Sequence, residues 1–333
     1  MADEQTTTLI MLDPDNRRAD MRFLNRKAWG VRWSDRKTSR NLAAQALGQA
    51  LRRPRPDPQG AGLALRTLAW QNKWIGAFES CAALSQRALS RLDPQETPDA
   101  VADVCAIMGV VHYSSGRRDL AADMIDKGLA HIDGMEATAT RIDLLVTKST
   151  IMRHNGRFTA AYDLLKQARE LAHGQELARV EHNVARCLDQ DHHPAEASTH
   201  AMQALIGARR HNNRVVLPYA LGVLGSALSQ MGQVKTALTY LAEGLSIADI
   251  DQDDRVKCQL LEQLGLISAL AGHNDSALEH FTHGLEIAKD LNYPVWQKKF
   301  LRETIKIFEA RGATYDALNA YRALVALLEA ERA

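Results

Sequence analysis

The 333-residue sequence is poor in the residues that mark several classes of protein. Aromatic side chains make up only 5% of it, and its four cysteines are scattered without paired spacing. A disulfide framework typical of small secreted domains is therefore not expected, and a reducing compartment is favoured. The apolar run at 215–228 is interrupted by Pro218, and the first twenty residues are polar. We therefore expect neither a membrane-spanning helix nor an apolar signal segment.

The charge is almost balanced, with 41 Lys and Arg against 40 Asp and Glu and a formal net charge of +1. Such a chain has no overall attraction for nucleic acid or for an anionic membrane, so we do not expect it to bind either. Only 9 prolines and 20 glycines occur among many Ala and Leu residues, a composition that favours helices. These features predict an all-α protein of the cytoplasm.

An internal repeat of about 40 residues organises the sequence. Each copy has a turn residue followed by small residues five and twelve positions later, as at Gly232 with Ala237 and Gly244. A left-handed turn residue ends one helix, and small side chains beyond it let two helices pack closely. Each copy is therefore predicted to be an antiparallel helix pair that stacks on its neighbours. The predicted turn residues are Gly76, Gly116, Gly156, His192, Gly232, Gly272 and Gly312.

This pattern resembles the tetratricopeptide repeat (TPR). Leu264-Gly265 match the large–small pair of its first helix, Gly272 matches the turn, and Ala277 and Phe281 match the second helix. The sequence lacks the proline that closes each unit of the family, and each copy gains about six residues, roughly one and a half helical turns. The long form is similar to repeats in sensory and scaffold regions of bacterial signalling proteins. The resemblance implies a right-handed α-solenoid of about eight helix pairs.

The first sixty residues follow the repeat less closely. We expect a disordered N-terminus at 1–13, a degenerate capping helix pair at 14–53 and a proline-rich link at 54–60. Seven TPR-like repeats are expected at 61–333. Trp29 and Trp33 lie in the cap beside an excess of basic residues. They are interpreted either as core residues beneath the cap or as contacts to an anionic partner.

In proteins that the sequence resembles, ligands lie in the groove lined by the first helices. Asn183 matches a position where related peptide-binding repeats carry an asparagine, whose amide can pair with any peptide backbone. Arg153, Arg179 and Arg186 are placed to hold a carboxylate. The predicted ligand-binding residues are Trp70, Lys73, Tyr113, Thr147, Thr150, Arg153, Arg179, His182, Asn183 and Arg186.

Two alternative interpretations of this groove remain open. Its polar side chains could simply solvate the inner wall and pair with Asp143 and Asp189. The run from Asp189 to His193 and the pair His280 and His283 invite a metal hypothesis, but neither offers three or four converging ligands. We therefore predict no metal site.

No phosphate-binding loop, nucleophile elbow or kinase signature occurs in the sequence, so no catalytic residue and no cofactor is predicted. We predict a protein- or peptide-binding scaffold or sensor in a bacterial signalling or regulatory pathway. The alternative is the N-terminal regulatory region of a signalling enzyme, such as a GGDEF-type diguanylate cyclase, or of a transcriptional regulator. The apolar residues Leu324, Val325 and Leu328 near the stack end predict a homodimer.

Overall fold

The computed structural model describes residues 14–52, 56–136 and 138–330, which form sixteen helices and no strand. The helices alternate between the first and second members of antiparallel pairs. The first helices are α1 (Pro14–Gly30), α3 (Pro58–Trp74), α5 (Pro98–Ser114), α7 (Thr138–His154), α9 (Gly174–Gln190), α11 (Val216–Gln230), α13 (Asp254–Leu270) and α15 (Pro294–Ala310). The second helices are α2 (Arg36–Ala50), α4 (Phe78–Leu89), α6 (Arg118–His131), α8 (Phe158–Leu171), α10 (Pro194–Arg210), α12 (Val234–Ile250), α14 (Asn274–Asp290) and α16 (Thr314–Ala330).

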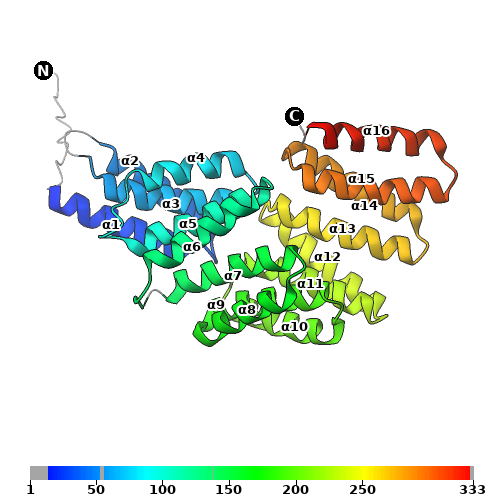
Figure 1. Cartoon of the computed structure of the whole chain (residues 1–333), viewed down its shortest axis with the longest axis horizontal. Helices are drawn as coiled ribbons and strands as arrows, with labels where there is room; N and C mark the ends of the chain where they lie inside the picture. Colours follow the sequence, from blue (N-terminus) through cyan, green and yellow to red (C-terminus); the bar gives the residue numbers. More distant parts are fainter. Residues whose placement is uncertain (1–13, 53–55, 137, 331–333) are drawn as a thin grey trace, which may run out of the picture.

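The pairs stack into a curved array. Each helix packs on the next, and each first helix also contacts the first helix of the following pair. In Figure 1 the chain runs from α1–α6 on the left, through α7–α12 at the bottom, to α13–α16 on the right. The predicted all-α, TPR-like solenoid of eight helix pairs is confirmed.

Each pair from the second to the eighth turns at a residue with left-handed backbone. Gly76 and Gly272 have φ angles of 78° and 79°, values that glycine adopts without steric cost. His192, which stands where the other repeats carry glycine, has a φ angle of 61°. The N–H of His193 donates to the carbonyl of Leu188 at 2.9 Å, which closes the end of α9. The turn geometry is therefore the same with and without glycine.

Small residues inside the pairs allow large side chains to reach across them. A Cβ atom placed on Gly265 of α13 would lie 2.2 Å from the ring of Phe281 in α14. A Cβ atom on Gly284 of α14 would lie 2.2 Å from the ring of Phe300 in α15. No real Cβ contact is that short, so both positions need glycine. The same small–large pairing thus holds a repeat together and joins it to the next.

Helix α3 begins earlier than expected. The first cap helix begins at Pro14, and helix α3 already begins at Pro58, so residues 58–60 of the expected link belong to the first repeat. Proline is favoured in the first helical turn, and Asp57 accepts a hydrogen bond from the N–H of Gly60 at 2.9 Å. The expected disorder at 1–13 concerns residues outside those that the structure describes.

The curve is tight enough for distant repeats to touch. Arg36 of the cap donates a hydrogen bond to Asp253, just before α13, at 2.7 Å. Asp253 is 1% exposed, so this ion pair is largely shielded from water. The rings of Phe78 in α4 and Tyr293, beside α15, pack with centroids 5.6 Å apart. We call these contacts the closing seam, because they join the first two helix pairs to the seventh and eighth.

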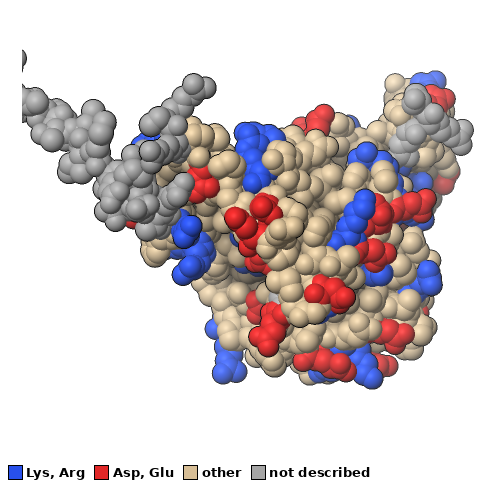
Figure 2. Space-filling view, turned by 60° about the vertical axis from the view of Figure 1, so that its left-hand side comes forward, with Lys and Arg blue, Asp and Glu red and all other residues tan. Residues whose placement is uncertain are grey.

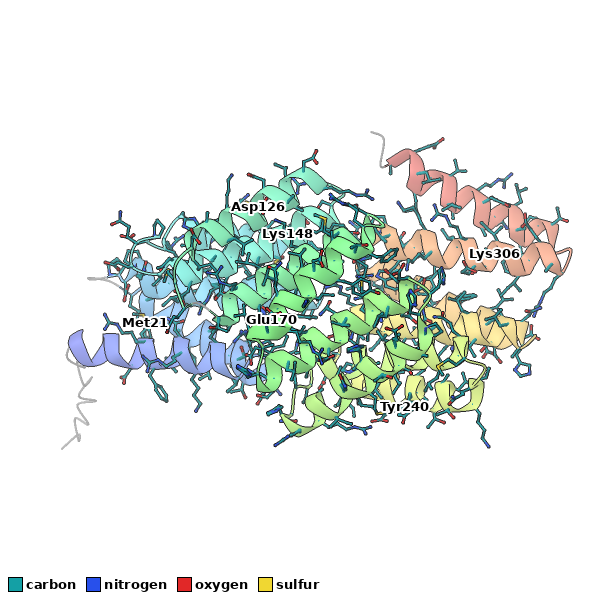
Figure 3. The ribbon with its side chains drawn as sticks, turned by 60° about the horizontal axis from the view of Figure 1, so that its bottom comes forward. Met21, Asp126, Lys148, Glu170, Tyr240 and Lys306 are labelled. Atoms are coloured by element: carbon teal, nitrogen blue, oxygen red, sulfur yellow. The ribbon has the colours of Figure 1, made fainter. Side chains whose placement is uncertain are left out.

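The outer surface carries both charge signs. Figure 2 shows Lys and Arg side chains interspersed with Asp and Glu over the face that it presents. Lys148 of α7 and Asp126 of α6 form an ion pair at 2.7 Å, and they lie side by side in Figure 3. Exposed pairs of this kind contribute little to stability.

We expect Gly265→Ala to lower the free energy of unfolding by about 1–3 kcal/mol, because its methyl group would overlap the Phe281 ring. The control is Gly48→Ala in α2, where a Cβ atom meets nothing within 4 Å and the better helix former should be neutral or stabilising. Urea unfolding followed by circular dichroism measures both. Equal midpoints for the two variants would show that the close approach does not hold the repeat.

Candidate ligand-binding site

A cavity of about 1130 Å³ lies on the inner side of the curve, and we call it the concave cavity. Its walls are built almost wholly from first helices, namely α3, α5, α7, α9, α11, α13 and α15, with Trp29 of α1 added. Because only the first helix of each pair faces inward, residues from seven consecutive repeats converge on one space. The volume exceeds that of an ordinary small-molecule pocket, which is about 300–1,000 Å³.

Nine of the ten predicted ligand-binding residues line this cavity. They are Trp70, Lys73, Tyr113, Thr147, Thr150, Arg179, His182, Asn183 and Arg186. The exception is Arg153, which is 3% exposed and is not among the residues that line the cavity. Its guanidinium donates to the side-chain oxygen of Gln190 and lies 3.0 Å from Nε2 of His154. Arg153 therefore lies between helices behind the cavity wall, and its role in ligand binding stays a prediction.

The predicted arginines differ in whether they are paired. Arg179 forms an ion pair with Asp143, as the interpretation of a self-paired inner wall expected. Asp189 instead accepts hydrogen bonds from Ser226 at 3.0 Å and Gln230 at 2.7 Å. Within the described residues Arg186 makes no hydrogen bond and no ion pair, so its partly buried guanidinium is available to a ligand.

The amide and hydroxyl groups of the cavity are partly used by their own helices. Asn183 Nδ2 donates to the carbonyl of Arg179 at 2.8 Å, which leaves its Oδ1 and one N–H for a ligand. Thr147 donates to the carbonyl of Asp143 at 2.8 Å, and Thr150 donates to that of Val146 at 3.0 Å. The threonine hydroxyls can therefore accept hydrogen bonds from a ligand.

An aromatic wall crosses the cavity between the cap and α11. Trp33 packs edge-on against Trp70 with centroids 4.8 Å apart, and Trp70 lies 5.7 Å from Trp74. Trp74 in turn lies 5.7 Å from Tyr219 of α11. Trp33 is 3% exposed, as expected for a core residue beneath the cap, whereas Trp29 lines the cavity.

The ligand-binding prediction missed several cavity residues, including Trp29, Trp74, Arg255 and Tyr293. Trp74 was detectable, because it follows Trp70 by four residues and so lies on the same helix face. Arg255 and Tyr293 enter the cavity next to the closing seam. No local pattern in the sequence indicates which repeats meet there.

The histidine-rich segment after α9 does not gather ligands. His193 Nε2 lies 3.8 Å from Asp191, and its Nδ1 lies 3.8 Å from Glu196. Across the described residues, no group of three or more His, Cys, Asp or Glu side chains is arranged to hold a metal ion. In the same part of the chain, no helix has the length and hydropathy to cross a membrane.

Lys73 lies in an unusual setting for a lysine. Its Nζ is 4.9 Å from the ring centroid of Trp74 and 5.6 Å from that of Trp70. Burial, followed by the positive charges of Arg179 and Arg255, lowers the pKa of Lys73 to about 7. Within the described part of the chain, no carboxylate forms an ion pair with the Lys73 ammonium group, which lies against the two indole rings instead.

We expect the Cε resonance of Lys73, identified by its loss in Lys73→Met, to titrate near pH 7 in the folded protein. Between pH 7 and about 10.5, Lys73 is then protonated in the unfolded chain but mostly deprotonated in the folded protein. The free energy of unfolding, relative to that of Lys73→Met, therefore rises with pH across this window. NMR of 13C-lysine-labelled protein and unfolding at several pH values measure the two effects. A lysine spectrum without any transition near pH 7 would contradict this description.

Comparison with known proteins identifies solved structures that have a similar fold. No family model matches this sequence, and no curated protein matches it either. A solved Rap protein, complexed with Competence and Sporulation Factor, superposes with a TM-score of 0.66 at 15% identity, over 94% of this chain and 99% of that one. NprR with its cognate peptide NprX gives 0.60 at 13% identity, over 94% and 89% of the two chains.

A third solved structure is a signal-transduction ATPase with a tetratricopeptide repeat sensor from Pyrococcus horikoshii. It superposes with a TM-score of 0.52 at 13% identity, over 96% of this chain and 51% of that one. These likenesses and the eight stacked pairs show that the chain has the fold of a tetratricopeptide-repeat superhelix.

Proposed function

We propose that this protein is a non-enzymatic sensor or scaffold that binds a short peptide or protein segment in the concave cavity. The observation that carries the proposal is the cavity itself, which gathers aromatic faces and polar side chains from seven repeats. Its size suits an extended segment better than a single small metabolite. Two solved structures with the same fold hold such ligands: a Rap protein is complexed with Competence and Sporulation Factor, and NprR with its cognate peptide NprX.

The cavity offers groups of the kinds that a peptide requires. Asn183 Oδ1 is placed to accept a hydrogen bond from a peptide N–H, and the Thr147 hydroxyl can accept a second. Trp70 and Trp74 supply apolar surface for side chains. Binding of this kind is independent of most of the ligand's sequence, while the neighbouring charges select among ligands.

The second candidate is that the chain acts as the regulatory region of a signalling enzyme or of a transcriptional regulator. The observation that favours it is the ATPase with a repeat sensor, because this chain matches only about half of that protein. An open reading frame that continues past Ala333 into an output domain would favour this candidate. In either case the concave cavity is the proposed site of recognition.

We also propose a cytoplasmic location. The four cysteines Cys81, Cys105, Cys187 and Cys258 are all buried free thiols. Burial raises the pKa of the Cys81 thiol to about 12 and that of Cys105 to about 11, so both remain protonated. Unreactive thiols without disulfides suit a reducing compartment.

We expect Asn183→Ala to weaken peptide binding about tenfold, because one or two hydrogen bonds to the peptide backbone are lost. The probe is the best-retained peptide from a pool of random short peptides, with affinity measured by fluorescence anisotropy. The matched control is Gln203→Ala, on the exposed side of α10, which should bind as wild type does. Failure of wild type to retain any peptide would refute the function, and unchanged affinity in Asn183→Ala would move the contact elsewhere.

We further propose that α16 mediates self-association. Its exposed face carries an apolar stripe of Leu318, Tyr321, Val325 and Leu328, which are 37–48% exposed. Each of these residues lies 40 positions after its counterpart in the preceding repeat. The counterparts are, in the same order, Leu278, Phe281, Leu285 and Ala288. In that preceding repeat Phe281 packs on Phe300, and Leu285 packs on Leu301 and Ile305. The stripe is therefore a stacking surface that no helix covers in the described part of the chain.

The spacing of the stripe fits a second copy of the same helix. Leu318 and Leu328 are equally distant from position 323, and so are Tyr321 and Val325. Under a two-fold axis through that position, each apolar residue meets another apolar residue. Leu324, which the sequence predicted to be exposed at the stack end, is instead 9% exposed and packs on Leu301.

We expect Val325→Asp to convert a dimer into a monomer, because it places a charge at the centre of the apolar contact. Sedimentation equilibrium at several protein concentrations measures the mass. The control is Ile206→Asp, at an isolated apolar residue of α10 that is 59% exposed, and it should leave the mass unchanged. Wild type that remains monomeric at the highest concentration would rule out this interface.

A further inference from the structure

Cationic side chains from three different repeats meet on the inner wall of the concave cavity. We call Lys73 of α3, Arg186 of α9 and Arg255 of α13 the cation cluster, and all three line the cavity. Burial is the largest cause that lowers the pKa of Lys73 and that of Arg186, and the charge of Arg255 lowers both further. Arg255 also donates a hydrogen bond to the carbonyl of Lys73 at 3.4 Å. Like charges held this close repel each other unless an anion lies between them.

The carboxylates of the cavity are engaged elsewhere. Within the described residues, none forms an ion pair with Lys73, Arg186 or Arg255. The existing pairs and hydrogen bonds are Asp103 with Arg66 at 2.9 Å, Asp143 with Arg179, Glu262 with Lys299 at 3.0 Å, and Asp189 with Ser226 at 3.0 Å. Among the described residues the cation cluster therefore has no carboxylate within ion-pair distance, although the charges of Asp189 and Glu262 act on Arg186 and that of Asp253 acts on Arg255.

Buried polar groups beside the cluster also lack partners. The indole N–H of Trp70, which is 1% exposed, and the hydroxyl of Tyr219, which is 5% exposed, make no hydrogen bond among the described residues. The indole N–H of Trp74 has none either. An indole N–H can only donate, and a buried donor without an acceptor destabilises the unliganded protein. All three side chains line the cavity, so a bound acceptor would satisfy them.

We propose that the cation cluster binds a carboxylate of the peptide ligand, with the indole and phenol groups as additional donors. This inference rests on the proposed peptide-binding function and specifies the ligand as an acidic peptide. The carboxylate belongs either to the peptide's C-terminus or to an Asp or Glu side chain. A single carboxylate fits better than a polyanion, because Asp189 and Glu262 line the same cavity and would repel further negative charge.

The test uses pools of N-acetylated short peptides that differ only in their carboxylates, incubated with the full chain at about 150 mM salt. The first pool has a free C-terminus and no Asp or Glu. The second has an amidated C-terminus and one Asp or Glu. The third is amidated and contains neither. Peptides that co-elute with the protein in size-exclusion chromatography are quantified by mass spectrometry, and a 5′-phosphorylated tetraadenylate serves as a non-peptide anion.

We expect the first or second pool to be retained about tenfold more than the third, and whichever is retained identifies the source of the carboxylate. Arg186→Gln and, separately, Lys73→Gln should each reduce that retention about tenfold, without affecting the neutral pool. The control Lys235→Gln, on the exposed side of α12, should match wild type, and circular dichroism verifies that each variant is folded.

The remaining outcomes overturn the inference in distinguishable ways. Equal retention of all three pools would leave peptide binding intact and refute the carboxylate site. Retention of the acidic pools that survives both substitutions would place the carboxylate elsewhere. Binding of the tetraadenylate in place of peptides would indicate a nucleic-acid ligand. Retention of neither peptide nor nucleotide would refute the proposed function itself.

Discussion

The close approach of two helices at a small residue, repeated about every 40 residues, is the contact on which the rest of the structure depends. At Gly265 the ring of Phe281 occupies the space that any Cβ atom would need, and Gly284 makes the same arrangement with Phe300. This contact fixes both the pairing within a repeat and the stacking on the next. Because the first helix of each pair lies on the inner side of the curve, all the first helices contribute side chains to a common interior.

The closing seam turns this interior into a cavity. Without the ion pair of Arg36 with Asp253 and the ring contact of Phe78 with Tyr293, the inner wall would be an open groove. The seam also brings Arg255 against Lys73, although these residues come from the seventh and second helix pairs. A ligand that bridges them would contact both sides of the seam. Its binding would then be linked to how firmly the array is closed.

Much of this architecture follows from sequence. The spacing of Gly76 to Gly312 predicted the turn inside each of the seven repeats, including the one at His192, because a small set of backbone geometries ends helices. Of the ten predicted ligand-binding residues, nine line the cavity, because the helical period fixes which side chains share a face of a first helix. Arg153 does not line the cavity, because its guanidinium is bonded to Gln190 in a neighbouring first helix, a contact that the helical period does not show. The seam and Arg255 were not predictable, because the curvature of the array sets which distant repeats meet.

The central claim is that recognition takes place on the first helices, inside the curve. Hydrogen–deuterium exchange with and without saturating peptide tests it most directly, because it reports on every helix at once. The account predicts slower exchange in α3, α9 and α13 when peptide is bound, with the second helices α6, α8 and α10 unchanged. Protection confined to those second helices would place the ligand on the outer surface and contradict the account.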